Sequence, residues 1–374
     1  MKLALVTETF PPEINGVSMT LGRLVDGLGL KGVSVTVITP RRRDRNGSSR
    51  NGCILQEVAG IPIPRYPELR FGLPARRLLG QQWAGNRPDL VHIATEGPLG
   101  WSALRAAREQ TVPVVSSFHT NFHAYGNHYG FGFMKKGVLS WLRYLHNQTE
   151  RTFVPSDDIV ETLGKDGFRN LRLLPRGVDT ALFNPRRRDN NLRASWGATP
   201  ETPVAIYVGR LAGEKNIGLV IRSWGRMQKV LPDLKLVVVG DGPDRKRLQR
   251  SCPDAHFAGM QQGEELAAHY ASADCFPFAS VTETFGNVVT EAMASGLVVL
   301  AYDYAAPGRF IQHLENGFLV PFNDEDSFLE TAIEMARVRY AWAEMGFKAV
   351  RTMSPHSWDS IVTQYLSELE SLFS

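Results

Sequence analysis

The stretch VAIYVGRLAGEKNIGLVIRSWGRMQKVLPDLKLVVVG, residues 204–240, joins two short apolar runs through an amphipathic segment. The runs at 204–210 and 234–240 are rich in valine and isoleucine, which is typical of strands buried on both faces of a sheet. Residues 216–231 space their large apolar side chains with a helical period. The order strand, helix, strand predicts a right-handed unit with two parallel strands.

The same alternation extends over the whole chain. Before the stretch, strands are predicted at 2–8, 33–39, 90–95 and 113–118, and helices at 18–32 and 101–110. After it, strands are predicted at 255–259, 275–279 and 297–303, with helices at 263–273 and directly after residue 286. The pattern breaks only at 174–191, where prolines, a glycine and a run of arginines indicate a linker. We therefore predict an α/β fold of two parallel-sheet domains with a ligand cleft between them.

Composition limits the function. A chain of 374 residues is too long for one ordinary core. The net charge of +4 is too small to indicate a nucleic-acid partner, and no apolar run reaches the roughly 18 residues of a membrane span. Three scattered cysteines are typical of a reducing compartment, so we expect a cytoplasmic protein. The arginine runs at 41–50 and 186–188 suit solvated loops or, alternatively, an anionic membrane surface.

Two loops that follow predicted strands carry groups suited to phosphate. Gly16 stands at the start of a helix, where backbone can approach a ligand closely, although a plain turn explains it equally well. Arg210 and Lys215 suit a diphosphate, because arginine contacts two oxygens and lysine supplies a compact charge. A surface ion pair with Glu214 is the alternative for these cations.

The segment ETFGNVVTE, residues 283–291, predicts a helix start that faces the cleft. Four residues are expected to form its first turn and to present N–H groups to a diphosphate: Phe285, Gly286, Asn287 and Val288. Glu283 precedes this turn and Glu291 lies more than one turn inside the helix. Carboxylates accept hydrogen bonds from vicinal hydroxyls, so the pair fits the ribose and the transferred sugar of a sugar nucleotide. The alternative without a ligand is that these glutamates are the acidic residues that are common at a helix N-terminus.

Other motifs are weaker. Three histidines, His119, His123 and His128, lie in one loop, but their spacing does not match a zinc site. His119 directly follows a strand and is expected to face the cleft. GDGP at 240–243 lacks the third glycine of a dinucleotide site and predicts a tight turn, and the acidic residues at 324–326 are better explained as a helix cap. We predict no metal site.

The motifs taken together resemble the retaining glycosyltransferases of family 4, which have the GT-B fold of two Rossmann-like domains. The resemblance covers nearly the whole chain and rests on NGV, SFHTNF, RGVD, VGRLAGEKN, VVGDGP and ETFGNVVTE in this order. The segments TEGPLGW, FHTNFHAYGNHYG and AYDYAAP are most similar to α-mannosyltransferases and to sulfoquinovosyl- and glucosyl-diacylglycerol synthases. One departure is Arg176, where the family usually has asparagine.

The resemblance implies a role for each matching residue. The catalytic group would be His119 at the reacting sugar, Arg210 and Lys215 on the diphosphate, and Glu283 on the sugar hydroxyls. The donor would also contact Gly16, Met260 (base), Phe285, Gly286, Asn287, Val288 and Glu291 (ribose), and the acceptor side would include Glu96, Asn121 and Tyr125. Residues 1–182, joined by a final helix at 357–374, would form the acceptor-binding domain, and residues 190–355 the nucleotide-sugar domain.

The predicted function is transfer of a hexose from a UDP- or GDP-linked sugar to a lipid or glycolipid, with retention and without a metal or other cofactor. It would take place at the cytoplasmic face of a membrane, to which the protein would bind peripherally. Two alternatives stay open: a sugar-nucleotide epimerase with the same fold, and a non-catalytic nucleotide-sugar-binding protein. The sequence leaves the donor, the acceptor and the oligomeric state undecided.

Overall fold

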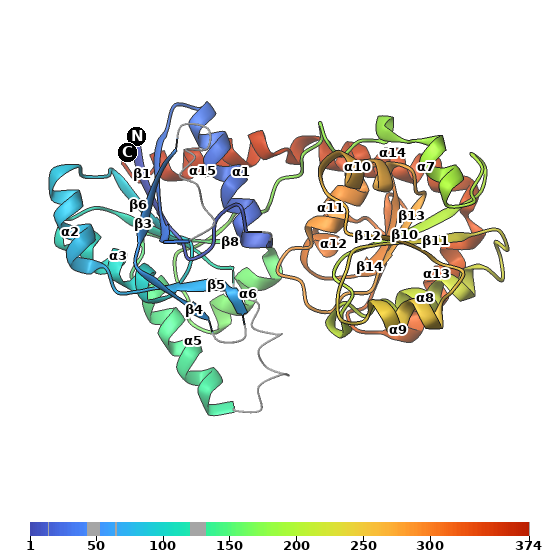
Figure 1. Cartoon of the computed structure of the whole chain (residues 1–374), viewed down its shortest axis with the longest axis horizontal. Helices are drawn as coiled ribbons and strands as arrows, with labels where there is room; N and C mark the ends of the chain where they lie inside the picture. Colours follow the sequence, from blue (N-terminus) through green and yellow to red (C-terminus); the bar gives the residue numbers. More distant parts are fainter. Residues whose placement is uncertain (14, 43–52, 64–65, 120–131, 374) are drawn as a thin grey trace. The chain divides into compact units, whose positions relative to one another are not determined.

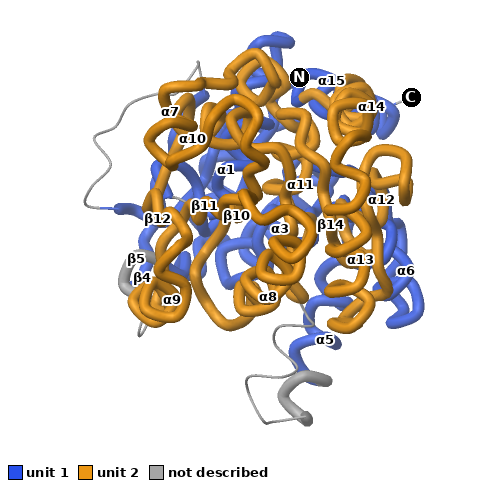
Figure 2. Tube along the Cα trace, turned by 90° about the vertical axis from the view of Figure 1, so that its right-hand side faces the viewer, with its two compact units in different colours: residues 1–176, 358–374 blue, residues 177–357 orange. Residues whose placement is uncertain are grey.

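The structure, a computed structural model, describes residues 1–13, 15–42, 53–63, 66–119 and 132–373 (Figure 1). The chain divides into two compact units (Figure 2): unit 1 is Met1–Arg176 with Trp358–Ser374, and unit 2 is Gly177–Ser357. The chain first passes from unit 1 to unit 2 between Arg176 and Gly177, within the segment 174–191 that we predict to be a linker. Among the described residues, no helix combines the length and the apolar character that crossing a bilayer requires.

Unit 1 contains a seven-stranded parallel sheet in the order β3-β2-β1-β6-β7-β8-β9. Its strands are β1 Lys2–Val6, β2 Ser34–Pro40, β3 Ile54–Val58, β6 Leu90–Ile93, β7 Val114–Ser117, β8 Arg151–Val154 and β9 Leu171–Leu173. The strands β4 Gly60–Ile63 and β5 Tyr66–Gly72 form a separate, antiparallel sheet of two strands. The helices are α1 Gly16–Leu30, α2 Arg76–Gly85, α3 Pro98–Glu109, α5 Gly132–His146, α6 Asp157–Lys165 and α15 Trp358–Glu370.

Unit 2 contains a six-stranded parallel sheet in the order β12-β11-β10-β13-β14-β15. Its strands are β10 Val204–Val208, β11 Lys235–Val239, β12 His256–Gly259, β13 Cys275–Phe278, β14 Val298–Tyr302 and β15 Gly317–Val320. The α-helices are α7 Asn190–Ser195, α8 Ile217–Met227, α9 Arg245–Ser251, α10 Gly263–Ala271, α11 Asn287–Ala294, α12 Ala305–Phe310, α13 Glu325–Arg337 and α14 Trp342–Met353, and the 3₁₀ turns are η1 Pro185–Arg187, η2 Gly213–Lys215, η3 Arg339–Ala341 and η4 Ser354–His356.

Both sheets are covered on both faces, which explains their continuous apolar strands. In β10, Ile206 and Val208 belong to one core cluster of unit 2, and Ala205 and Tyr207 belong to another. Successive side chains of a strand point to opposite faces, so each face of the sheet has its own core. The predicted α/β class and the two parallel sheets are therefore confirmed.

The last helix, α15, returns to unit 1 and packs against α1 (Figure 1). It begins directly after Ser357, and Asp359 of its first turn lies 2.8 Å from the Lys31 Nζ atom at the end of α1. The predicted cap at 324–326 is also present, since Asp324 accepts a hydrogen bond from the N–H of Ser327 (3.0 Å) at the start of α13.

Candidate active site

In unit 2, the order of the strands reverses between β10 and β13, which are neighbours in the sheet. Open parallel sheets bind ligands outside the carboxyl ends of the strands at such a switch point. The loop after β10 carries Arg210 and Lys215, and the loop after β13 carries Glu283 and Gly286. The topology of unit 2 alone thus places these four residues on both sides of the crevice that is expected at the switch point.

Lys215 and Glu283 form an ion pair across this crevice, with 2.5 Å between Nζ and Oε1. The Oε1 atom also accepts a hydrogen bond from the Ser280 hydroxyl (2.8 Å). Both side chains are largely buried, with exposed fractions of 21% for Lys215 and 14% for Glu283. The sequence predicts separate ligand contacts for these residues, whereas the structure pairs them, so a bound diphosphate would share Lys215 with the carboxylate.

The second predicted cation, Arg210, has different surroundings. Its side chain is 65% exposed and lies 3.5 Å from the Glu214 carboxylate, which is the alternative that the sequence left open. Its carbonyl accepts a hydrogen bond from the buried Tyr207 hydroxyl (3.1 Å), and burial raises the pKa of this phenol. Arg210 is therefore held by its backbone carbonyl and pairs with Glu214 at the surface, whereas Lys215 is largely buried.

Helix α11 begins at Asn287, directly after residue 286 as the helical pattern predicts. The separate expectation that Phe285 and Gly286 belong to its first turn is wrong. Phe285 is fully buried and its carbonyl accepts a hydrogen bond from the N–H of Ala306 (2.8 Å). Gly286 precedes the helix with a φ of 96°, in the left-handed region that favours glycine. Asn287 and Val288 remain as the first helical residues.

Two tyrosines that the sequence analysis did not select, Tyr304 and Tyr270, support the two glutamates. The Tyr304 hydroxyl accepts from the N–H of Glu283 (3.2 Å) and donates to the carbonyl of Ser280 (2.7 Å), which fixes the loop after β13. The Tyr270 hydroxyl donates to Glu291 Oε2 (3.1 Å). Burial raises the pKa of Tyr270 well above its ordinary value, so it remains a donor at neutral pH. Of these two tyrosines, only Tyr304 lies in a motif that the sequence analysis quoted, AYDYAAP.

Met260 lies away from these residues. It directly follows β12, the strand at the edge of the unit 2 sheet, and its side chain is 60% exposed. Its position at a carboxyl strand end fits a surface for a nucleotide base, and in the sheet β11 lies between its strand and β10.

Unit 1 has a similar switch point between β1 and β6. Gly16 begins α1, which follows β1. Glu96 follows β6, and its Oε1 atom lies 3.3 Å from Nε2 of the fully buried His146. Asn121 and Tyr125, the other predicted acceptor-side residues, and the loop histidines His123 and His128 lie outside the described residues.

His119 follows β7 at the same edge of the unit 1 sheet. Its side chain is partly exposed, but both ring nitrogens are buried and have no hydrogen-bond partner in the described ranges. Burial, and then the positive charge of Arg176, hold the pKa of His119 well below its ordinary value. The imidazole is therefore neutral, and can donate to or accept from a sugar hydroxyl.

Glu8, two positions after the end of β1, is a further, partly buried acid that the sequence analysis did not select. Its Oε1 atom accepts a hydrogen bond from the N–H of Gly72 (3.4 Å), and its own N–H donates to the Thr95 hydroxyl (2.9 Å). Burial, with a smaller contribution from the neighbouring Glu96, raises the pKa of Glu8 to about 7. Its carboxyl group thus changes charge near neutral pH.

Glu8→Gln is expected to raise the thermal unfolding midpoint at pH 8 and to change it little at pH 5. Because the pKa of Glu8 lies above its ordinary value of 4.5, the folded state loses stability as the pH rises from 4.5 to about 7. Glutamine resembles the protonated acid and escapes this loss. The midpoint is measured at pH 5, 6, 7 and 8, with the exposed Glu161→Gln as the matched control. A difference that stays constant with pH would contradict the assignment.

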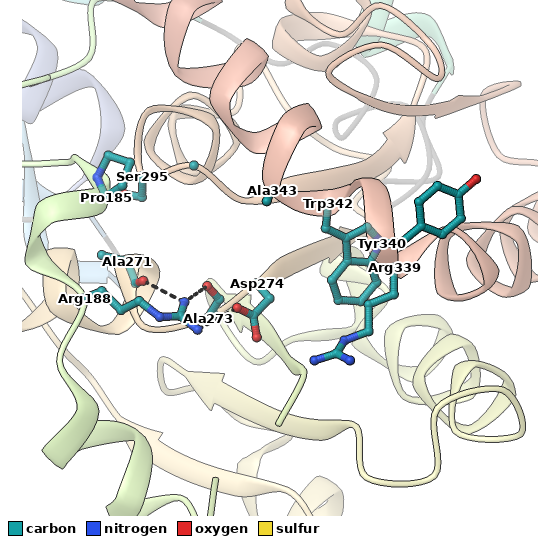
Figure 3. Close-up of a pocket in the computed structure, with 11 residues that line it drawn as sticks. Pro185, Arg188, Ala271, Ala273, Asp274, Ser295, Arg339, Tyr340, Trp342 and Ala343 are labelled. Atoms are coloured by element: carbon teal, nitrogen blue, oxygen red, sulfur yellow. Dashed lines mark hydrogen bonds and ion pairs between the residues drawn. The ribbon is translucent and has the colours of Figure 1, made fainter. Parts of the chain in front are cut away.

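A pocket of about 620 Å³ lies elsewhere in unit 2, near the amino ends of β13 and β14 (Figure 3). Its Arg188 guanidinium donates to the Asp274 carboxylate (2.9 Å) and to the carbonyls of Ala271 and Ala273. Arg188 and Asp274 therefore pair with each other inside unit 2, and this pair holds the linker segment. Arg187 likewise pairs with Glu264 (3.3 Å), so these two arginines of the run at 186–188 have partners in the protein.

Comparisons with known proteins show the family of the chain. The family model described as Glycosyltransferase Family 4 matches residues 14–182, and the one described as Glycosyl transferases group 1 matches residues 188–339. A GDP-mannose-dependent alpha-mannosyltransferase of Mycolicibacterium smegmatis is 34% identical over 378 residues, which cover 100% of this chain and 98% of that protein. The sulfoquinovosyl transferase SQD2 of Arabidopsis thaliana is 32% identical over 82% of this chain and 61% of its own length.

The fold also matches a solved structure. The Anabaena protein Alr3699/HepE in complex with UDP superimposes with a TM-score of 0.80 and 17% identity, covering 99% of this chain and 100% of that chain. At this identity, the likeness concerns the fold.

Proposed function

Because the chain belongs to glycosyltransferase family 4, we propose that it transfers a hexose from a nucleotide sugar to a lipid or glycolipid acceptor. The chain has the GT-B fold and is a hexosyltransferase. The observation that carries the finer proposal is the buried pair of Lys215 and Glu283 beside the start of α11, at the switch point of unit 2. A diphosphate there would meet a cation and the positive end of a helix, and a sugar would meet a carboxylate.

The donor we expect first is GDP-mannose. The Mycolicibacterium smegmatis relative, which aligns with the whole chain, is named for this donor, whereas SQD2 is named for sulfoquinovose transfer. Relatives named alpha-monoglucosyldiacylglycerol synthase support a lipid acceptor, and with it peripheral binding at the cytoplasmic face of a membrane. The quoted relatives are named transferases and synthases, which favours transfer over the epimerase and the non-catalytic alternatives.

The reaction would proceed on one face of the sugar. The bond from C1 to the phosphate oxygen breaks, a bond from C1 to the acceptor oxygen forms, and the acceptor proton passes to the leaving diphosphate. Lys215 would stabilise the charge on that diphosphate, and Glu283 would orient the sugar through its hydroxyls. Catalysis would then depend on positioning and electrostatics, and would need no metal.

Turnover in the presence of EDTA tests this proposal. The protein is incubated with GDP-mannose, UDP-glucose or UDP-sulfoquinovose, with and without diacylglycerol in vesicles, and nucleotide release and glycolipid formation are followed. We expect glycolipid to form with one donor, at a rate that EDTA leaves unchanged. NMR of the product should show the same anomeric configuration as in the donor. Release that requires a divalent metal, or a product of inverted configuration, would contradict the mechanism. The absence of release with every donor would favour a binding protein.

A further inference from the structure

The carboxylate of Glu283 is held at only one of its two oxygen atoms. Its Oε1 atom lies 2.5 Å from the Lys215 Nζ atom and accepts a hydrogen bond from the Ser280 hydroxyl (2.8 Å). Within the ranges that the structure describes, no hydrogen bond ends on the Oε2 atom. All three residues belong to unit 2. The carboxylate is therefore fixed from one side, and its second oxygen remains for a further hydrogen-bond donor.

Ser280 holds this oxygen from a fixed backbone. It lies two positions after the end of β13 and is only 1% exposed. The Tyr304 hydroxyl donates to the carbonyl of Ser280 (2.7 Å) and accepts from the N–H of Glu283 (3.2 Å). One hydroxyl thus ties both ends of the segment 280–283. Because this segment is fixed, the Ser280 hydroxyl stays directed at the carboxylate three residues further along the chain.

The held carboxylate lies beside the start of α11. A Cβ atom on Gly286 would stand 3.7 Å from the Glu283 Cγ atom, and Gly286 immediately precedes this helix. A helix N-terminus attracts phosphate, so a sugar attached to a diphosphate at this place comes within reach of Glu283. A hydroxyl that donates to an ionised carboxylate forms a stronger hydrogen bond than one that donates to a neutral group.

We propose that Ser280 is a positioning residue for the donor sugar: together with Lys215 it fixes Oε1 of Glu283, so that Oε2 accepts a hydrogen bond from one sugar hydroxyl. The proposal rests on the proposed function, in which Glu283 orients the transferred sugar. Ser280 itself does not touch the sugar, because its buried hydroxyl donates its one proton to Oε1. A donor without a free hydroxyl at the position that faces Oε2 is rejected, since it leaves that oxygen unpaired.

Calorimetry with a sugar nucleotide and its free nucleotide separates positioning from a structural role. Either GDP-mannose with GDP or UDP-glucose with UDP is used, whichever sugar nucleotide binds the wild type more tightly. Ser280→Ala should weaken the sugar nucleotide by about 10-fold and leave the free nucleotide within about twofold, because only the sugar meets Glu283. The control Ser223→Ala removes an equally buried hydroxyl of unit 2, which donates to the Val220 carbonyl (2.8 Å), and should change neither affinity. Equal losses for both ligands in Ser280→Ala would overturn the proposal.

Deoxy analogues of the same sugar nucleotide test the Oε2 contact on the wild-type protein, so this measurement does not depend on how a variant folds. Each analogue lacks one hydroxyl of the sugar. One of them should bind about 10- to 100-fold more weakly than the parent, because it leaves Oε2 without a hydrogen bond. In Ser280→Ala the deficit of that analogue should shrink. Wild-type affinity for every analogue would contradict the proposal.

Glu283→Ala shows whether Ser280 acts through the carboxylate. Glu283→Ala alone and Glu283→Ala with Ser280→Ala should bind the sugar nucleotide equally weakly, since the hydroxyl has no carboxylate left to hold. A further loss in the double variant would overturn the positioning role. Because calorimetry needs no turnover, a protein that shows the expected binding but transfers no sugar would refute the proposed function and still support the role of Ser280.

Discussion

Lys215→Ala is expected to lower kcat by about 100- to 1,000-fold while the protein stays folded. This is the usual loss when one preorganised group that stabilises developing negative charge is removed from an active site. The Lys215 Nζ atom is held 2.5 Å from Glu283 and is the more buried of the two cations in its loop. The charge on the leaving diphosphate grows as the sugar bond breaks, so kcat should fall more than the KM for the donor rises.

The stability cost of this change should be modest. Removing Lys215 leaves the Glu283 carboxylate without its cation, but the Ser280 hydroxyl still donates to it (2.8 Å). We expect the free energy of unfolding to fall by about 1–2 kcal/mol. The matched control is Lys348→Ala, which removes an exposed lysine of the same unit from a pair with Glu344 and should keep full turnover. A Lys215→Ala protein with wild-type kcat would remove this residue from the site.

The double variant Lys215→Ala with Glu283→Ala shows whether the pair acts as one unit. Groups that act together lose most of their effect when either is removed, so the double variant should be only slightly slower than the slower single variant. Losses that multiply would instead indicate two independent contacts to the donor, as the sequence predicted.

The sequence predicts the buried strands of this fold well, because their apolar runs are continuous. Strands β1, β6, β7, β10, β11, β12, β13 and β14 fall within predicted runs, and β2 extends one residue beyond its run. The analysis missed three edge strands, β3, β9 and β15, together with the separate pair β4 and β5 and the inner strand β8. Edge strands pair on one side only and need no continuous apolar pattern, so their periodicity is weak.

The site divides in the same way. Positions such as Lys215 and Glu283 are predictable to within a loop, because the topology places the loops that follow parallel strands at one edge of the sheet. Their mutual distance is not, since it depends on how two loops fold over the sheet edge. The contact between Tyr270 and Glu291 joins α10 to α11, and no local pattern marks it. Arg176 was noted as a departure from the family, but only the structure shows its neighbour Gly16.

Among glycine-to-alanine substitutions in unit 2, we expect Gly240→Ala to destabilise the protein most. A Cβ at position 240 would lie 2.0 Å from the carbonyl oxygen of Gly209 and 3.0 Å from its carbonyl carbon. The φ of Gly240 is 132°, which side chains rarely adopt. Backbone cannot move aside as a side chain can, so the loops after β10 and β11 must separate. We expect the free energy of unfolding to fall by about 2–4 kcal/mol.

Gly240→Ala should also lower the rate of sugar transfer, by more than the loss of folded protein alone would explain. The loop after β10 carries Lys215, and a displacement of about 1 Å in a positioned group can cost about 100-fold in rate. Two other glycines separate the causes. Gly286→Ala meets nothing closer than 3.7 Å and bears only the strain of its positive φ, about 1 kcal/mol. Gly225→Ala, exposed in α8 with open space around it, should stabilise by about 0.5–1 kcal/mol. Unfolding and donor binding of the three variants, measured together, should therefore rank Gly240→Ala lowest in both; equal losses for Gly240→Ala and Gly286→Ala would show that the loops do not need their close approach.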